Sequence, residues 1–185
     1  MSSEPLHREA TYEDLLRVPE HLVAEIVDGE LFTSPRPGSR HSHATGVLYA
    51  HLHRLFAEER GEWWFVFEPE LHLGSEVFVP DIAGWRRSRM PVVPDVAAFD
   101  LSPDWVCETV STKTAQLDRY RKLPRYAKHE IPHDWIVDPV AFGVEVYRLE
   151  QRHWTLVETR HGDVAIRAEP FEAGEINLAL MWLKS

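Results

Sequence analysis

The chain has a single cysteine, Cys107, among its 185 residues. One thiol excludes an internal disulfide framework and any zinc site built from several cysteines. Long apolar runs are missing too, since no stretch approaches the roughly 18 apolar residues that a membrane-spanning helix needs, and the first residues lack the apolar segment of a signal peptide. We therefore expect a cytoplasmic protein without a membrane partner.

Motifs of several common enzyme classes are also absent. The chain has no glycine-rich phosphate loop, no Gly-x-Ser-x-Gly nucleophile motif and no dinucleotide-binding fingerprint. These absences argue against kinases, hydrolases with a serine nucleophile and dehydrogenases.

Positive charge is scarce, with 20 Lys and Arg against 30 Asp and Glu and a net charge of −10. This balance is unusual for a protein that binds nucleic acid, because Lys and Arg contacts to phosphates supply most nonspecific affinity. The charge is uneven, however, and two basic clusters are candidates for DNA binding. Their alternative is a solvated helix face and a solvated loop. The clusters comprise Arg86, Arg87 and Arg89, and then Lys113, Arg119, Arg121, Lys122, Arg125 and Lys128 with one acidic residue, Asp118, among them.

The composition supports one folded domain over residues 1–185, with residues 1–10 expected to form a flexible tail. Hydrophobic residues make up 44% of the chain, including 7 Trp, 8 Phe and 5 Tyr, and charged residues make up 27%. A chain of this length can bury a substantial core without disulfides or metals, and the composition argues against disorder.

Hydrophobic periodicity predicts an α/β domain. The clearest signal is Asp28-Gly29 between two apolar runs, which is typical of a hairpin with a two-residue turn. Helical spacing predicts helices over residues 12–18, 42–60 and 115–128, the last kinked by Pro124. Strands are predicted at 22–27, 30–33, 63–73, 76–85, 105–110, 135–137, 144–149 and 154–158, with an apolar element at 176–183 and an irregular proline-rich stretch at 90–103.

Glu108 interrupts the apolar run from Trp105 to Val110, which is expected to form a strand buried on both faces. An ionised and unpaired carboxylate there is costly, so Glu108 needs a cation, a hydrogen-bond network, a metal or a proton. Asp81 is predicted to continue the preceding strand in the phase of Val79. Two carboxylates that end adjacent strands suit Mg²⁺ or Mn²⁺, because water and phosphate oxygens can complete the octahedron.

Lys122 is the candidate for a catalytic lysine, since a lysine near a metal can orient the nucleophile or neutralise charge on a phosphate. It lies in the predicted helix after the Glu108 strand, and Asp118 precedes it by one turn on the same face. The alternative is a surface pair between Asp118 and Lys122, worth only about 0.3 to 0.5 kcal/mol.

Several segments together resemble one protein family. Any one of them is a weak signal, but their order and spacing over about residues 12–150 are similar to the Uma2 family, which is regarded as a family of restriction endonucleases within the PD-(D/E)XK nuclease superfamily. The segments are Glu25-Ile-Val-Asp-Gly-Glu30, the Pro35/Pro37 loop leading to His41, Val79-Pro80-Asp81-Ile82, Trp105 to Ser111, the positions Asp118, Lys122 and Tyr126, and Ile131 to Asp138.

The resemblance implies a restriction-endonuclease-like fold of the α/β or α+β class, a central mixed β-sheet flanked by helices, here with additional β-hairpins. It also implies that Asp81 and Glu108 bind the metal, with the main-chain carbonyl of Thr109 as a further ligand. One position departs from the superfamily pattern, because Val110 stands where the general motif has lysine. Lys122 is the residue that would supply the missing lysine.

Glu25, His41 and Asp118 form a second tier of candidates. Glu25 is a further acid for the site, or an outward residue of a hairpin strand. His41 matches the family pattern, whereas a local capping or packing role is the alternative for both His41 and His43. Cys107 alternates to the face opposite Glu108 and is expected to be a small core residue.

Three functions remain open. The first is a Mg²⁺- or Mn²⁺-dependent endonuclease that hydrolyses DNA phosphodiesters, with DNA as its partner. The second is a nucleic-acid-binding or interaction module that has kept the fold and lost cleavage. The third is a metal-dependent phosphohydrolase for a small substrate. Restriction-like enzymes often form homodimers to cut both strands, but no segment of this sequence identifies an interface.

Overall fold

A computed structural model describes residues 8–112 and 114–184. The predicted tail at residues 1–10 lies mostly outside the described residues. Within it, the Ala10 N–H donates a hydrogen bond to the Gly29 carbonyl at 2.8 Å. Lys113, one of the candidate DNA-binding residues, also lies outside the described residues.

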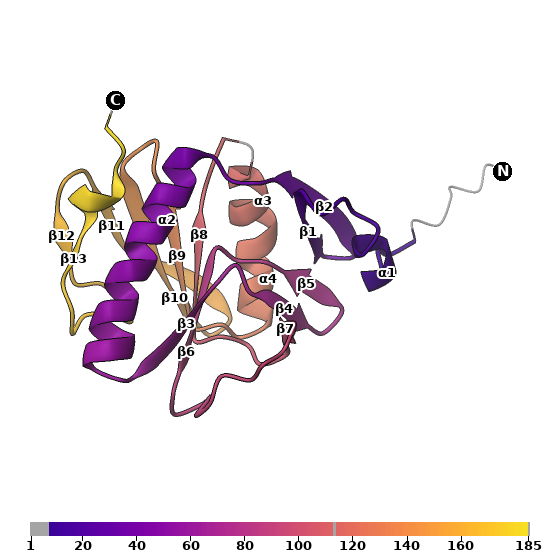
Figure 1. Ribbon diagram of the computed structural model, residues 1–185, viewed down its shortest axis with the longest axis horizontal. Helices are drawn as coiled ribbons and strands as arrows, with labels where there is room; N and C mark the ends of the chain where they lie inside the picture. Colours follow the sequence, from indigo (N-terminus) through magenta and orange to yellow (C-terminus); the bar gives the residue numbers. More distant parts are fainter. Residues whose placement is uncertain (1–7, 113, 185) are drawn as a thin grey trace.

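A six-stranded sheet forms the centre of the molecule (Figure 1). Its strands lie in the order β11-β10-β9-β8-β6-β3, and only β8 and β9 run parallel, so the sheet is mixed as expected. The strands are β3 (Trp63–Phe67), β6 (Ile82–Arg86), β8 (Trp105–Thr109), β9 (His133–Asp138), β10 (Gly143–Glu150) and β11 (His153–His161).

A second, five-stranded sheet has the order β2-β1-β5-β4-β7. The predicted hairpin is confirmed, since β1 and β2 pair antiparallel around Asp28 and Gly29, whose φ angles are 55° and 75°. These positive φ values are those of a tight two-residue turn. The strands are β1 (Leu22–Val27), β2 (Glu30–Pro35), β4 (Glu70–Leu73), β5 (Glu76–Phe78) and β7 (Ala98–Phe99), the last within the stretch predicted to be irregular.

The two long strands predicted at 63–73 and 76–85 are wrong in one respect, because each is divided between the two sheets. The inner halves, β4 and β5, pair with each other, and the outer halves, β3 and β6, pair in the central sheet. Glu68 breaks the first with a φ of 45°, and Pro80, which has no N–H to donate, lies in the break of the second. Asp81 therefore lies between β5 and β6 and does not continue a strand in the phase of Val79.

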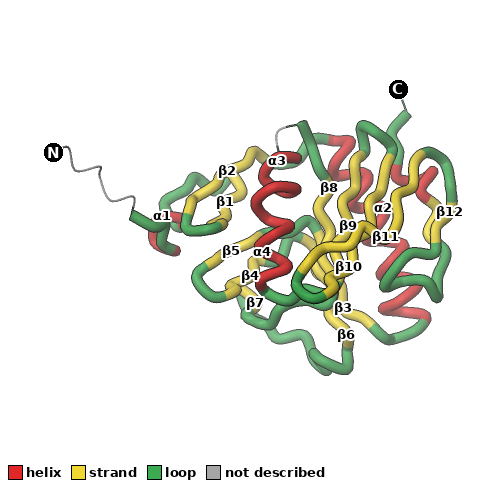
Figure 2. The backbone as a smooth tube through the Cα atoms, turned by 180° about the vertical axis from the view of Figure 1, so that it is seen from behind, coloured by secondary structure: helices red, strands yellow, loops and turns green. Residues whose placement is uncertain are grey.

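Helices cover both faces of the central sheet. The helix of α2 (Ser39–Leu52) and η1 (His53–Glu59) lies on one face, and the helix of α3 (Ala115–Leu117), η2 (Asp118–Lys122) and α4 (Leu123–Lys128) lies on the other (Figures 1 and 2). Both long helices are thus confirmed. The first helix, α1 (Tyr12–Leu15), is shorter than predicted, and the apolar element at 176–183 comprises β13 (Ile176–Asn177) and η3 (Leu178–Met181), with β13 paired to β12 (Ala165–Ile166).

Alternation along β8 decides which residues face the second helix. Trp105 and Cys107 belong to the core that includes α2, whereas Val106 belongs to the core that includes Tyr126 of α4. Since neighbouring residues of a strand point to opposite faces, Glu108 lies on the side of the second helix. In the part of the chain that the structure describes, no helix is long and apolar enough to cross a membrane.

Candidate active site

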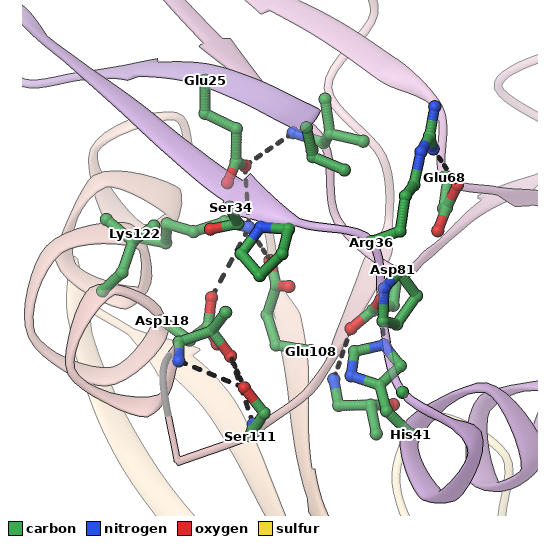
Figure 3. A pocket seen from close by; sticks show the side chains of 18 of the residues that line it. Glu25, Ser34, Arg36, His41, Glu68, Asp81, Glu108, Ser111, Asp118 and Lys122 are labelled. Atoms are coloured by element: carbon green, nitrogen blue, oxygen red, sulfur yellow. Dashed lines mark hydrogen bonds and ion pairs between the residues drawn. The ribbon is translucent and has the colours of Figure 1, made fainter. Parts of the chain in front are cut away.

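A pocket of about 370 Å³ lies where the β1–β2 hairpin, the end of β8 and the start of the second long helix meet (Figure 3). Its lining includes the main chain or side chains of Asp81, Glu108, Thr109 and Lys122, and those of the second-tier candidates Glu25, His41 and Asp118. Residues from five separate parts of the sequence therefore converge here.

Lys122 lies at the centre of a buried charge cluster. Its Nζ is 2.8 Å from Glu25 Oε1, 2.8 Å from Glu108 Oε1 and 3.7 Å from Asp118 Oδ1. The pair with Asp118 exists, but Lys122 is only 2% exposed and lies closer to the other two carboxylates, so it is not a surface pair. Glu25 faces this cluster and does not point outward.

The π-helical segment η2 carries both Asp118 and Lys122. It ends two residues before Pro124, which cannot donate a hydrogen bond to the carbonyl one α-turn earlier. The kink expected at Pro124 stays a prediction, and both charged side chains line the pocket.

The electrostatics of the cluster reflect one cation shared by three carboxylates. Burial raises the pKa of Glu108 well above its ordinary value, and attraction to Lys122 only partly opposes this. Burial likewise raises the pKa of Asp118 to about 6, again against the pull of Lys122. Burial disfavours the ammonium form of Lys122, but attraction to Glu108, Glu25 and Asp118 outweighs it and raises its pKa well above the ordinary value.

Hydrogen bonds fix the two acids that the sequence singled out. Asp81 Oδ1 lies 2.6 Å from His41 Nε2, and Asp81 Oδ2 accepts a hydrogen bond from the Thr109 N–H at 2.7 Å. The hydroxyl of Tyr126 donates to Glu108 Oε1 at 2.5 Å. Each carboxylate is therefore held in one orientation by groups from other elements.

Thr45 links the first helix to the end of β8. Its Oγ1 donates to the His41 carbonyl at 2.9 Å and lies 2.8 Å from Thr109 Oγ1. Sequence reasoning did not identify Thr45, although its spacing of four residues from His41 places the two on one face of a helix.

The donor set suits a hard divalent cation in type and charge. Five carboxylates, one ammonium and one guanidinium line the pocket, so negative charge is in excess, and carboxylates with raised pKa values gain from an added cation. Within residues 8–112 and 114–184, no three side chains of His, Cys, Asp or Glu are placed to hold one ion. The residues that could hold it are Asp81, Glu108 and the Thr109 carbonyl, with water and substrate oxygens as the other ligands.

The arginines of the basic helix engage acidic side chains outside the pocket. Arg119 pairs with Glu145, Arg121 Nη2 lies 2.6 Å from Glu30 Oε1, and Arg125 Nε lies 2.6 Å from Glu76 Oε1. Of the other cluster, the guanidinium of Arg86 lies 4.5 Å from the ring centre of Trp63. Arg87 lies 3.8 Å from the ring centre of Trp64 and donates to the Ala57 carbonyl at 2.9 Å. Their role in DNA binding stays a prediction.

Arg36 is a pocket residue that sequence reasoning missed. It lies between Pro35 and Pro37 in the loop before α2, and its guanidinium Nη1 is 3.5 Å from Glu68 Oε2 (Figure 3). The signal available in the sequence was the position of this loop, which directly precedes His41.

A family model described as "Putative restriction endonuclease", Uma2, matches residues 10–180. The fold is similar to the crystal structure of a putative nuclease belonging to DUF820 from Anabaena variabilis ATCC 29413, with a TM-score of 0.74 and 23% sequence identity over 93% of this chain and 97% of that chain. No curated protein matches this chain. The structural likeness confirms the predicted fold class.

Proposed function

Since the chain belongs to the Uma2 family, we propose that it is a nuclease that uses Mg²⁺ or Mn²⁺ to hydrolyse DNA phosphodiester bonds. One observation carries the proposal. Asp81 comes from the connection between β5 and β6, Glu108 from β8 and Lys122 from η2, and all three line a single pocket. Carboxylates that can hold a metal and a cation beside them are groups that metal-assisted phosphodiester hydrolysis can use.

Each group has a role in the proposed reaction. When bound, a divalent ion would polarise the phosphate and lower the pKa of water. Asp81 and Glu108 would hold that ion, and their orientations are set by the Thr109 N–H and the Tyr126 hydroxyl, respectively. Lys122 would neutralise charge that develops on the phosphate or orient the attacking water.

The position of Lys122 bears on the missing lysine, because Val110 stands where the superfamily pattern has lysine. The superfamily pattern places a lysine two residues after the glutamate, but Val110 is buried and apolar. Lys122 brings an ammonium group to 2.8 Å from Glu108 Oε1 from the neighbouring helix. This proximity supports the proposal that Lys122 replaces the missing lysine.

The second candidate is a module that binds nucleic acid without cleaving it. It is favoured by the same contacts, because Lys122 already compensates Glu25 and Glu108 without any metal. A buried ion cluster of this kind needs no catalytic role to explain it.

Cleavage assays with isosteric variants test the proposal. Plasmid, linear and single-stranded DNA are incubated with the protein in Mg²⁺ or Mn²⁺, alongside Asp81→Asn and Glu108→Gln variants whose folding is checked by circular dichroism. We expect wild-type cleavage that both variants lose, and Mn²⁺ binding by calorimetry that both weaken. A wild type that neither cuts DNA nor binds Mn²⁺ would refute the nuclease and leave the binding module.

A further inference from the structure

The groups proposed to act on the phosphodiester lie deep in the pocket. Glu108 is 3% exposed and Lys122 2%. A phosphate must therefore enter the pocket to reach them. The volume of about 370 Å³ lies near the lower end of the roughly 300 to 1,000 Å³ that is typical of small-ligand pockets. It has room for about one nucleotide and not for a section of double helix.

The wall of the pocket is in large part apolar. Beside the carboxylates it is lined by Val23, Pro35, Pro37, Val79 and Leu117. An unpaired nucleotide exposes the faces of its base and sugar, which can pack against such a wall. In an intact duplex the base is stacked and paired, and enzymes that need access to it act on single strands or flip the base out.

Among the described residues of the basic helix, two arginines are already paired with carboxylates. Arg121 pairs with Glu30, and Arg125 with Asp28 as well as Glu76, so these guanidinium groups already face carboxylates. Nonspecific binding of duplex DNA depends on several cations that each contact a phosphate. With a net charge of −10, affinity has to come from contacts within and around the pocket.

Arg36 is a cation at the pocket that a phosphate can recruit. Its side chain is 59% exposed, its Nη1 lies 3.5 Å from Glu68 Oε2, and its Nη2 donates to the Glu20 carbonyl at 3.3 Å. These contacts are long, and exposed ion pairs contribute little free energy. The flanking Pro35 and Pro37 restrict the backbone on both sides, and a guanidinium can bind a phosphate through two parallel hydrogen bonds.

Building on the nuclease function proposed above, we propose that the pocket accepts one unpaired strand of DNA and that Arg36 binds a backbone phosphate of that strand. The substrate would be a single-stranded segment, an overhang or a flap, and not the interior of an intact duplex. Arg36 and Glu68 would separate as the phosphate replaces the carboxylate.

Binding and cleavage are measured separately so that the two proposals can fail independently. Fluorescence anisotropy with the Glu108→Gln variant follows a labelled single strand, a blunt duplex of the same sequence and a duplex with a single-stranded tail. We expect the single strand and the tailed duplex to bind about tenfold or more tightly than the blunt duplex. Adding Arg36→Gln to this variant should weaken single-strand binding about tenfold, and Arg36→Lys should restore part of it.

Arg167 provides a matched control. Its side chain is 58% exposed and its Nε lies 3.6 Å from Glu175 Oε2, much like the pair at Arg36, but it does not line the pocket. Arg167→Gln should leave binding unchanged. Equal losses from Arg36→Gln and Arg167→Gln, or no loss from either, would overturn the role of Arg36.

Wild-type cleavage of the same three substrates completes the test. Cleavage confined to the single strand and the tail supports the inference. A blunt duplex that is bound and cut as well as the single strand overturns it and leaves the nuclease intact. Binding of the single strand that depends on Arg36, without cleavage of any substrate, supports the unpaired-strand inference and refutes the nuclease.

Discussion

The two faces of β8 are built in opposite ways. Trp105, on the face toward α2, packs its ring centre 5.7 Å from that of Trp135 and 5.1 Å from that of Phe171. The other face, toward the second long helix, buries Glu108 against Lys122. One short strand thus separates an aromatic core from a buried charge cluster.

The two faces are expected to contribute differently to stability, the aromatic face more and the charged face less. Aromatic packing stabilises in proportion to the apolar area that it removes from water. Buried ion pairs have to recover the loss of hydration, and apolar residues of similar volume often stabilise as much or more. The charge cluster at the end of this otherwise apolar strand is therefore expected to contribute less stability than the aromatic face.

The largest expected effect is on the aromatic face. Trp105→Ala should lower the free energy of unfolding by about 3 to 5 kcal/mol, because it leaves a cavity in a fully buried site. Urea denaturation followed by circular dichroism measures the change. Val92→Ala, at a side chain that is 77% exposed, is the control and should change the stability by less than about 0.5 kcal/mol. A Trp105→Ala protein as stable as this control would contradict the proposed core.

The second prediction concerns the charged face, where Lys122 is the buried cation. Lys122→Met should lower the free energy of unfolding by about 3 kcal/mol, since it leaves Glu108 and Glu25 buried without their cation. Adding Glu108→Gln should recover about 1 to 2 kcal/mol of this loss, as expected for coupled groups. Arg121→Met is the matched control, because Arg121 also has a carboxylate at 2.6 Å but is 39% exposed, and its loss should stay below about 1 kcal/mol. Strictly additive effects of Lys122→Met and Glu108→Gln would show that the two groups are not coupled.

Asp134 is a further buried acid near Lys122, and its titration makes the stability of the fold depend on pH. It is 1% exposed, and neither carboxylate oxygen has a hydrogen-bond partner among the described residues. Burial raises the pKa of Asp134 well above its ordinary value, and repulsion from Asp118 and Glu145 raises it further. Attraction to Lys122 and Arg119 lowers the pKa only in part. Because the folded pKa is raised, Asp134 reduces stability as the pH rises above its ordinary pKa of 3.8 toward the folded value.

Asp134→Asn should remove that pH-dependent penalty. We expect the variant to be more stable than the wild type by about 1 to 3 kcal/mol at pH 7, and the gain should shrink as the pH falls to about 4. Thermal unfolding across this pH range measures it. Asp95→Asn, at an exposed position, should show no such trend. A gain that is the same at all pH values would exclude titration of Asp134 as its cause.

The contrast between the faces was largely visible in the sequence. The apolar run around Glu108 predicts a strand buried on both faces, and alternation separates Cys107 from Glu108. A buried glutamate in such a strand requires a cation, and the neighbouring helix offers Lys122. These steps use only local patterns, which is why β8, the hairpin at Asp28-Gly29 and both long helices are confirmed.

What depends on distant partners could not be read from the sequence. Glu25 of β1 pairs with Lys122 of η2, and Arg36 pairs with Glu68 at the pocket. The division of residues 63–73 between two sheets also escaped prediction, although Pro69, which has no N–H for a ladder hydrogen bond, lies next to the break at Glu68. Pairing partners and ion pairs of this kind are set by tertiary structure, and no local period encodes them.

The smallest expected effect lies where the two faces meet. The Thr109 hydroxyl lies 2.8 Å from the hydroxyl of Thr45 of α2, while the Thr109 N–H donates to Asp81 at the pocket. Thr45→Val keeps the shape of the side chain but removes the hydroxyl, so it should cost about 1 kcal/mol of stability. If the contact also positions Thr109 for Asp81, Mn²⁺ affinity measured by calorimetry should fall several-fold. Thr155→Val, at a half-buried threonine that donates a hydrogen bond to Glu150, should leave that affinity unchanged. Equal metal affinity in the Thr45→Val variant and the wild type would show that this contact does not position Asp81. Thr45 would then affect the pocket only through the stability of the whole fold.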